Sequence, residues 1–406
     1  MGKQKKIGIV TIVDYLNYGN RLQNYAVQEV LKNLGYEAIT IRNIPYDDRK
    51  FLTDGLSSKE QRQNKWKQYP FMRIFLLEKK KARYLYSNIR HKAFYWKRKI
   101  TYMFNTMTGK KSNHATLYQK REERFMEFSK KNIKESKFVL SEVKQNQKQL
   151  ETFDFFVTGS DQVWNPNYKR ANGIYFLQFA PKYKRIAFSA SFGIGAYPEN
   201  RKLQLKKYLN GMQYISVREQ RGKELVEENS DKKATVLIDP TLMLPKEKWE
   251  KLAQKPQCKF PEKYVLSFFL GGTDEETRNY INRQAIAREA EVVSFADVKS
   301  EAYFVLNPAE FVYLIAHAQK VFTDSFHACV FSIIFHRNFQ AFRRKKVADM
   351  FSRLETLLNT FGLEACIYDS DHDNSAMISV ETYDSVDNIL EKKREEAYSW
   401  LKDAFS

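Results

Sequence analysis

A single histidine, His327, follows a short apolar strand and a polar turn and opens an apolar helix. The run Val321–Thr323 predicts the strand, and the run Phe326–Phe335 predicts the helix. The N-terminus of a helix offers unpaired N–H groups and the positive end of the helix dipole, so it binds phosphates and carboxylates. An imidazole beside a bound anion can give it a proton. The segment therefore indicates anion binding with acid catalysis, and the alternative is a histidine buried in the core.

An arginine, Arg218, occupies a similar position after the apolar run Ile215–Val217 and before a predicted helix. A guanidinium can hold a carboxylate or a phosphate through paired hydrogen bonds. The alternative is an ion pair with Glu219 or Glu224. We therefore take Arg218 as the candidate for anion binding, alongside His327 as the candidate acid.

Small or polar loops follow five predicted strands. Because the carboxyl ends of parallel strands meet at one edge of a sheet, we expect these loops to line a common cleft. The loops are Asn17–Arg21, Gly159–Asp161, Ser191–Gly193, Ser216–Arg218 and Thr323–His327. The alternative is that their glycines and hydroxyls only close the turns.

The candidate cleft residues are Asn17, Asn20, Gly159, Ser160, Asp161, Trp164, Ser191 and Gly193. We also take them as candidates for contact with an acceptor substrate. Trp164 is either a cleft residue or a structural plug. Asp324 and Ser325 stand where they can cap the helix that His327 opens, which is compatible with facing an anion. Asp239 is expected to end a strand rather than to take part in chemistry. The other histidines lack metal-ligand spacing, so no metal is predicted.

Alternating strand and helix patterns divide the chain into two α/β units. The strand runs Ile7–Val13 and Glu37–Ile41 flank a helical pattern, and this opening predicts a parallel sheet. The stop at Asp239-Pro240 is the expected boundary between the units. We predict an N-terminal lobe over residues 1–240, a C-terminal lobe over residues 241–384 and a final helix over residues 385–406 that can cross back to the first lobe.

The positive charge of the chain is concentrated in one segment. The chain has 68 Lys and Arg against 48 Asp and Glu, a net charge of +20. Residues 59–137 hold 23 Lys and Arg and 6 Asp and Glu, with aromatic residues between them, and so carry +17. We expect a basic helical insertion in the N-terminal lobe here, suited to an anionic membrane surface. The alternatives are a solvated helical subdomain and a nucleic-acid surface, but no recognised nucleic-acid motif is present, so nucleic acid is not an expected partner.

Composition excludes several classes of protein. A chain of 406 residues with 43% hydrophobic residues has room for two folded domains. Its three cysteines, Cys258, Cys329 and Cys366, are odd in number and far apart, which excludes a disulfide framework. No window approaches the roughly 20 apolar residues of a membrane span, and the N-terminal apolar run is too short for a signal peptide. We expect a cytoplasmic protein, with peripheral contact at the inner face of the cell membrane through the basic segment.

Six short motifs follow one another along the chain. They are Asp14-Tyr15-Leu16-Asn17-Tyr18-Gly19-Asn20-Arg21-Leu22-Gln23, Gly159-Ser160-Asp161-Gln162-Val163-Trp164-Asn165, Ser189-Ala190-Ser191-Phe192-Gly193, Ser216-Val217-Arg218-Glu219, Asp239-Pro240-Thr241 and Thr323-Asp324-Ser325-Phe326-His327. In this order and combination they resemble the polysaccharide pyruvyl transferase family. The resemblance covers about residues 5 to 345, apart from the basic segment.

The resemblance implies a GT-B-like α/β fold of two Rossmann-like lobes. It implies transfer of pyruvate from phosphoenolpyruvate onto sugar hydroxyls of a cell-surface polysaccharide, such as a capsule or exopolysaccharide, or of its lipid-linked precursor. The product is a ketal, phosphate is released, and no cofactor is needed beyond the donor substrate. By the family's pattern His327 acts as the acid and Arg218 binds the donor. The further donor-site candidates are Asp324, Ser325, Phe326 and Arg21.

One position departs from the family's pattern. The family's other donor-binding arginine lies two residues before the histidine, where this chain has Ser325. A hydroxyl carries no charge and cannot replace a guanidinium. Either donor use has changed, or another arginine supplies the charge. The candidates for that role are Arg21, Arg337, Arg343 and Arg344.

Two rival functions remain at this point. A glycosyltransferase of the same fold would use a nucleotide sugar and seat its diphosphate at Asp324–His327. A non-catalytic scaffold of a polysaccharide-assembly complex would bind partners through the basic segment and bind no donor. The sequence fixes neither the acceptor sugar and its linkage nor the oligomeric state.

Overall fold

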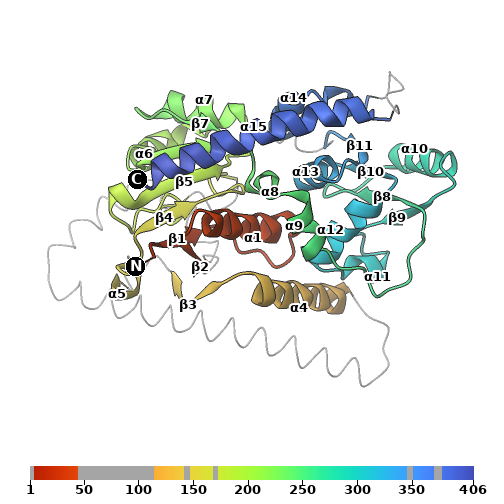
Figure 1. Ribbon diagram of the computed structural model, residues 1–406, viewed down its shortest axis with the longest axis horizontal. Coiled ribbons are helices and arrows are strands. Elements are labelled where there is room, and N and C mark those ends of the chain that lie inside the picture. The colour runs from red at the N-terminus through yellow and green to blue at the C-terminus, as the bar shows by residue number, and fades with distance from the viewer. Residues whose placement is uncertain (1–3, 44–113, 141–146, 168–171, 345–350, 370–376) are drawn as a thin grey trace. The chain divides into compact units, whose positions relative to one another are not determined.

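The computed structural model describes residues 4–43, 114–140, 147–167, 172–344, 351–369 and 377–406, drawn in colour in Figure 1. The described residues up to 43 and from 121 onward belong to one compact unit, which contains both sheets. A second unit, residues 46–120, is described only for the first residues of one helix. The basic insertion expected over residues 59–137 lies outside the described residues as far as position 113, so it stays a prediction.

Seven parallel strands form the first sheet, in the order β3-β2-β1-β4-β5-β6-β7. This is the strand order of a Rossmann fold with one strand added at an edge. The order reverses between β1 and β4, so the loops after these two strands flank a natural position for a ligand. The strands are β1 (Lys6–Val10), β2 (Glu37–Asn43), β3 (Glu135–Leu140), β4 (Phe155–Thr158), β5 (Arg185–Ala190), β6 (Tyr214–Val217) and β7 (Thr235–Val236).

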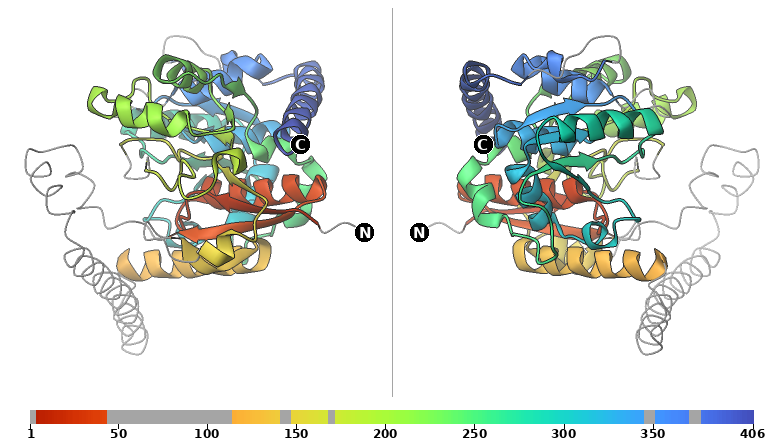
Figure 2. Two further views of the ribbon diagram at one scale, coloured as in Figure 1. Left: turned by 90° about the vertical axis from the view of Figure 1, so that its left-hand side faces the viewer. Right: turned by 90° about the vertical axis from the view of Figure 1, so that its right-hand side faces the viewer.

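Alternate residues of these strands pack into two cores, one on each face of the sheet. Ile7, Val157 and Phe188 belong to the core under α1 and α15, whereas Phe156 and Ala187 belong to the core under α6 and α7. Figure 2 shows α6 and α15 on opposite sides. Both faces are covered, as a parallel sheet requires. The helices of this part are α1 (Tyr18–Asn33), α4 (His114–Asn132), α5 (Gln147–Leu150), α6 (Glu199–Leu209), α7 (Gln220–Asn229), α8 (Pro240–Met243) and α9 (Lys246–Leu252).

The edge strand β3 begins inside the range expected to be helical. It pairs with β2 and runs from Glu135 to Leu140, so the last three residues of the range expected to be helical belong to a strand. Only Ser136 and Leu140 of this strand are buried, and the exposed Lys137 and the half-buried Phe138 and Val139 stand between them. An edge strand has one covered side and one pairing partner, so its apolar alternation is weak and the sequence pattern did not indicate it.

The second sheet has four parallel strands in the order β11-β10-β8-β9. Its order reverses between β8 and β10, which again places two loops at a natural ligand position. The expected α/β fold with two Rossmann-like sheets is therefore confirmed. The elements are β8 (Tyr264–Phe268), α10 (Glu275–Ile286), β9 (Glu291–Ser294), α11 (Glu301–Phe304), α12 (Pro308–His317), β10 (Lys320–Thr323), α13 (Phe326–Ile334), β11 (Asn338–Ala341), α14 (Ser352–Phe361) and α15 (Val380–Ala404).

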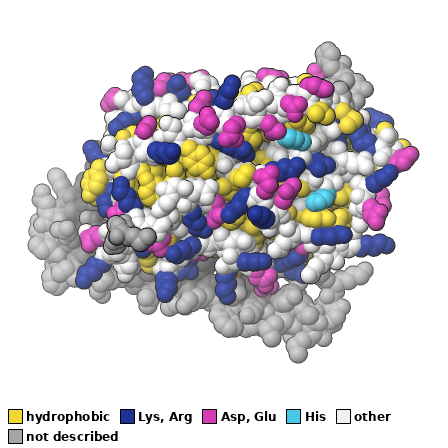
Figure 3. All heavy atoms as spheres, viewed as in Figure 1, with side chains coloured by type: hydrophobic (Ala, Val, Ile, Leu, Met, Phe, Trp, Pro, Cys, Tyr) yellow, Lys and Arg dark blue, Asp and Glu magenta, His cyan; other side chains and the backbone are white. Residues whose placement is uncertain are grey.

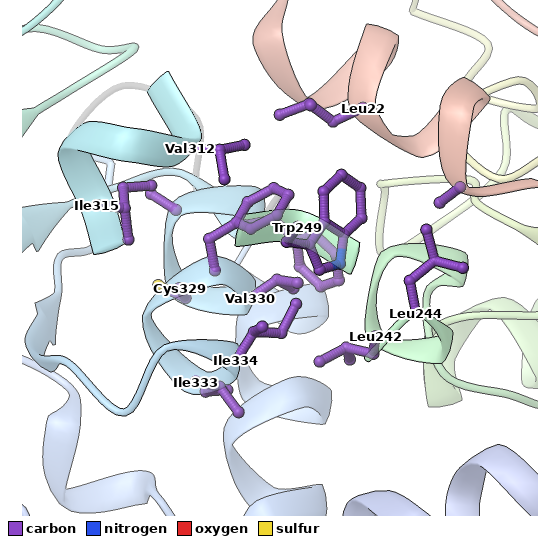
Figure 4. Close-up of a cluster of buried hydrophobic side chains, with 14 of the residues drawn as sticks. Leu22, Leu242, Leu244, Trp249, Val312, Ile315, Cys329, Val330, Ile333 and Ile334 are labelled. Atoms are coloured by element: carbon purple, nitrogen blue, oxygen red, sulfur yellow. The ribbon is translucent and has the colours of Figure 1, made fainter. Parts of the chain in front are cut away.

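One continuous apolar core joins the two sheets (Figure 4). Trp249 of α9 is fully buried and makes edge contacts with Tyr25 of α1 and Phe331 of α13, at centroid distances of 5.6 and 4.8 Å. The hydroxyl of Tyr18 donates to the carbonyl of Leu306 at 2.8 Å. Close packing of this kind leaves little freedom between α1 and α13, so residues on their facing first turns are held together.

Helix α15 links the second sheet to the first. Near its start, the Tyr383 hydroxyl donates to the Arg337 carbonyl, and near its end Trp400 stacks on Phe188 of β5 at 6.5 Å. The helix begins at Val380 and runs past α8 to the first sheet (Figure 1). Basic and acidic side chains are interspersed over the described part of the face in Figure 3. Within the ranges described, the structure contains no helix of the length and apolarity that crossing a membrane requires.

Candidate active site

The guanidinium of Arg218 lies at the centre of a buried cluster of carboxylates. Arg218 follows β6 and is 4% exposed. Its Nη1 donates to Asp239 Oδ2 at 2.8 Å and to Ser160 Oγ at 3.4 Å. Its other nitrogens lie 3.7 Å from Asp161 Oδ1 and 3.9 Å from Glu219 Oε2. Nε and Nη2 have no hydrogen-bond partner among the described residues, so the edge of the guanidinium that these two nitrogens form makes no hydrogen bond.

Mutual attraction in this cluster keeps its members ionised in spite of burial. Burial alone would raise the pKa of Asp239, but Arg218, then His327, and hydrogen bonds lower it to about 2. Burial likewise opposes ionisation of Asp161, yet Arg218 and His327 lower its pKa below the usual value. Burial disfavours the charge on Arg218, and the surrounding carboxylates raise its pKa above the usual range. The site therefore holds fixed charges in a low-dielectric environment, where electrostatic effects are large.

His327 opens α13 with its ring against the first turn of α1. A Cβ at Gly19 would overlap the imidazole, so only glycine permits this approach. His327 is 8% exposed, and its Nε2 lies 3.9 Å from Asp239 Oδ2, too far for a hydrogen bond. Nε2 has no partner among the residues described. Burial lowers the pKa of His327 to about 4, with Asp239 raising it and Arg218 lowering it, so the imidazole is neutral at pH 7.

The N-terminus of α13 is left without a side-chain cap. Ser325 stands at the N-cap position but makes no capping hydrogen bond. Asp324, expected to cap this helix, instead accepts from backbone N–H groups of Leu270 and Gly271, after β8, at 2.7 and 2.8 Å. It also pairs with Arg344 at 3.0 Å. The first N–H groups of α13 therefore face the position beside His327 without a competing side chain, as an anion seat requires.

The ring of Phe326 lies close to Arg218, His327 and Arg353. The Arg218 guanidinium carbon lies 4.7 Å from the ring centroid, within the range of a cation–π contact. The His327 ring meets the same ring edge-on at 5.3 Å. The guanidinium carbon of Arg353, in α14, lies 5.9 Å from the same centroid. Phe326 thus fixes one histidine and two arginines around a common apolar surface.

The loop after β1 contributes structural hydrogen bonds to this cluster. The Asn17 side chain caps α1, and the Asn20 amide donates to Asp161 Oδ2 at 2.8 Å. Arg21 is fully buried; its Nη2 donates to a backbone carbonyl and to the Asn20 side chain, both at 2.8 Å. Its Nη1 lies 3.6 Å from Glu135. Asn20 therefore positions Asp161, and Arg21 is held mainly by its own loop and β3.

Two of the expected cleft residues serve packing. Trp164 is fully buried, stacks on Phe176 with ring centroids 4.9 Å apart and donates a hydrogen bond from Nε1 to a backbone carbonyl. These contacts agree with the alternative in which Trp164 is a structural plug. Gly159 has a φ of +125°, and a Cβ there would collide with the Phe188 carbonyl oxygen. Glycine is needed at this position because the backbone passes so close to β5.

The loop after β5 holds Glu219. Ser191 Oγ and the backbone N–H groups of Phe192 and Gly193 donate to Glu219 Oε1 at 2.9, 2.8 and 3.2 Å. These neutral donors stabilise the carboxylate, and Oε2 faces Arg218. In the part of the chain that the structure describes, no group of three or more His, Cys, Asp or Glu could hold a metal ion.

Comparison with known families identifies the family to which the chain belongs. The sequence matches the family model for polysaccharide pyruvyl transferase over residues 17–345, which is most of the chain and includes every described strand of both sheets except β1. The chain belongs to the polysaccharide pyruvyl transferase family. No curated protein matches the sequence.

Solved structures resemble this pyruvyl transferase family member only distantly. A putative UDP-N-acetylglucosamine 2-epimerase from Listeria monocytogenes matches with a TM-score of 0.45 and 11% identity, covering 98% of this chain and 91% of that chain. MnaA of S. aureus with UDP gives 0.44 and 10%, with 98% and 90% coverage. A glycosyltransferase from Rickettsia africae gives 0.43 and 11%, with 100% and 95% coverage. The description of the fold therefore rests on strand order.

Three residues of the candidate site were not expected from the sequence. Asp239, interpreted as the end of a strand, is the main partner of Arg218. Glu219, taken only as an alternative ion-pair partner, connects the loops after β5 and β6. Arg353 carried no sequence signal. A signal did exist for Asp239, because Asp-Pro-Thr follows an apolar run as the other loops do.

The fit of His327 against Gly19 gives a testable prediction. Gly19→Ala is expected to lower turnover at least tenfold, because the added methyl displaces the imidazole from its place beside Arg218. Gly173→Ala is the matched control, since a Cβ there meets its neighbours at 3.5 Å. Turnover and melting temperature of both variants should be measured together. Normal turnover in Gly19→Ala would show that the position of the ring does not matter.

Proposed function

We propose that this protein transfers pyruvate from phosphoenolpyruvate onto two hydroxyls of a glycan, forming a ketal and releasing phosphate. The observation that carries the proposal is the pairing of His327 with Arg218 at the uncapped N-terminus of α13. His327 Nε2 and two nitrogens of Arg218 lack hydrogen-bond partners among the described residues, although all are buried. An acid, a guanidinium and a helix N-terminus are what an anionic enol phosphate requires.

The reaction begins with a proton. Protonated His327 gives a proton to the methylene carbon of the donor, and the adjacent carbon becomes electrophilic. A sugar hydroxyl attacks that carbon and gives its proton to the imidazole of His327, which restores the imidazolium. The carbon–oxygen bond to phosphate then breaks, and a second hydroxyl closes the ketal while its proton leaves with phosphate. Arg218 and the helix N-terminus stabilise the carboxylate and the departing phosphate throughout.

His327 must acquire its proton when the donor binds. Its pKa of about 4 in the free protein leaves the imidazole neutral at pH 7. A bound phosphate and carboxylate would add negative charge beside it and raise the pKa, as the nearby carboxylates already do in part. The proposal therefore couples donor binding to protonation of the acid, so the acid is charged only when the substrate is in place.

The acceptor is a cell-surface glycan or its lipid-linked precursor, in keeping with the family. We further propose that the basic segment, residues 59–137, brings the enzyme to the anionic inner face of the membrane, where such precursors reside. The support for this is the net charge of +17 with interleaved aromatic residues. Sedimentation with phosphatidylserine vesicles tests it: neutralising these charges should abolish vesicle binding, and unchanged binding would count against it.

The identity of the donor is tested by what the enzyme releases. Purified full-length protein with a glycan extract should release inorganic phosphate from phosphoenolpyruvate and add a pyruvate ketal, measured by mass spectrometry of the glycan. Nucleotide sugars should yield no nucleoside diphosphate. Release of nucleoside diphosphate without ketal formation would instead establish a glycosyltransferase. If neither donor binds in calorimetry, the remaining interpretation is a non-catalytic scaffold.

A further inference from the structure

Arg353 is a second buried guanidinium beside Arg218, and it comes from a different element. It occupies the first turn of α14, at the end nearest α7, where the Gln220 backbone N–H donates to Thr356 Oγ1 at 3.3 Å. Helices α13, α14 and α7 pack together here (Figure 1). The position brings a side chain 26 residues beyond His327 into contact with the loop that carries Arg218.

The environment of Arg353 is unfavourable for a cation. The residue is 7% exposed, and no carboxylate of the described residues forms an ion pair with it. It stands in the first turn of α14, where the positive end of the helix dipole disfavours positive charge. Burial, followed by the charge of Arg218, lowers its pKa to about 10, although the carboxylates of Glu219 and Asp161 act in the opposite direction, so Arg353 still carries its charge at pH 7. Arg353 is therefore a buried cation without a directly paired carboxylate, and a bound anion would supply the missing counter-ion.

A neutral side chain orients the Arg353 guanidinium. With the Gln162 amide turned so that its oxygen faces α14, this oxygen accepts from Nη1 and Nη2 of Arg353 at 2.9 and 3.0 Å. The Arg353 Nε has no partner among the described residues. Gln162 therefore fixes the direction of the guanidinium without neutralising its charge. A residue that binds an anion needs both properties, whereas a structural ion pair would neutralise the charge.

Phe326 relates the two arginines to each other. Both guanidinium carbons lie within 6 Å of its ring centroid, at 4.7 Å for Arg218 and 5.9 Å for Arg353. Two like charges held this near one another repel, and an anion bound to both removes the repulsion. Two other arginines near the motif pair with carboxylates: Arg344 pairs with Asp324, and the exposed Arg343 pairs with Glu355.

We infer that Arg353 is the second donor-binding cation of this site and that, with Arg218, it holds the two anionic groups of a carboxylate-bearing phosphate donor. The inference rests on the proposed function and names the residue that supplies the charge missing at Ser325. Arg353 binds through Nε and the free hydrogens of its terminal nitrogens, while Gln162 holds it in direction. Phe326 lies within 6 Å of both guanidinium carbons.

Arg353→Gln in the full-length protein tests the inference. It should raise the KM for phosphoenolpyruvate about 10- to 100-fold, since charge-assisted hydrogen bonds to the donor are lost, with a smaller change in kcat. Arg343→Gln removes an exposed arginine from the same region and should leave KM within about twofold. If the wild type uses phosphoenolpyruvate and Arg353→Gln has the same KM for it, the inference is wrong.

A second variant covers the case in which Arg353→Gln fails to fold. Gln162→Glu puts a carboxylate at hydrogen-bonding distance from both terminal nitrogens of Arg353. If Arg353 binds the donor, this variant should keep or raise the melting temperature and still raise KM at least tenfold. If Arg353 is only structural, the melting temperature should rise with KM unchanged, and the inference is wrong.

Binding of inorganic phosphate separates this inference from the proposed function. If the wild type does not use phosphoenolpyruvate but is stabilised by inorganic phosphate in a thermal shift assay, and Arg353→Gln is not, then the two-arginine anion site stands and the donor is wrong. Phosphoenolpyruvate turnover with KM unaffected by both variants overturns the inference and leaves the proposed function intact. A wild type that binds neither probe overturns both.

Discussion

His327→Ala is expected to abolish pyruvyl transfer from phosphoenolpyruvate while leaving the protein folded. Positioned general acids contribute about 10²- to 10⁴-fold to rate, and the methylene carbon of the donor is a poor proton acceptor without one. The ring makes an edge contact with Phe326 and no hydrogen bond through Nε2 among the described residues, so its removal leaves no buried polar group unpaired. Phosphate release and the far-ultraviolet circular dichroism spectrum of the same preparation check both parts.

The controls for this prediction come from the chain itself. His317→Ala removes an exposed histidine at the end of α12, stacked only on Tyr313, and should keep wild-type turnover. His327→Gln retains a hydrogen-bonding side chain of similar size but cannot act as an acid near neutral pH, so it should be as inactive as His327→Ala. Turnover within about threefold of wild type in His327→Gln would remove the imidazole from the proton-transfer step.

The sequence located the two groups that lie directly after apolar strands. Arg218 and His327 each follow a run of buried residues by a few positions, and parallel strands bring such positions to one edge. The order of β1 to β6 is a consequence of the same alternation of apolar runs and amphipathic helices. The local sequence pattern therefore predicted which side chains reach the site, because a residue that directly follows a parallel strand lies at the carboxyl edge of the sheet.

Sequence could not predict which partners these groups meet. Asp239 lies 21 residues beyond Arg218, and only the pairing of β7 beside β6 brings the two charges within 2.8 Å. Arg353 stands among polar residues in an amphipathic helix, where an arginine ordinarily faces water, and tertiary packing of α14 against α7 buries it. For Asp324 the sequence carried a clear signal that the structure does not follow. The side chain was expected to cap α13, but it accepts hydrogen bonds from the N–H groups of Leu270 and Gly271 after β8 instead.

The buried pair of Arg218 and Asp239 is expected to show strong coupling in a double-mutant cycle. Arg218→Met leaves Asp239 buried without its cation and should lower the free energy of unfolding by roughly 3–5 kcal/mol. Asp239→Asn alone leaves Arg218 with Asp161 and Glu219 and should cost less. Combining the two changes removes both charges, so the double variant should recover a substantial part of the stability that Arg218→Met loses. Urea unfolding at pH 7 measures all four proteins.

The pH dependence and the activity of these variants separate the structural from the chemical role of Arg218. Because the pKa of Asp239 is lowered to about 2 in the folded protein, its ionisation stabilises the fold above its ordinary pKa of 3.8 and ceases to do so as the pH falls towards 2. Asp239→Asn should therefore flatten the loss of stability between pH 4 and 2. The double variant should regain stability but no phosphate release, because no neutral side chain can hold the donor. If Arg218→Met and the double variant are equally unstable, the pair is not coupled, and Arg218 is held by Asp161 and Glu219 instead.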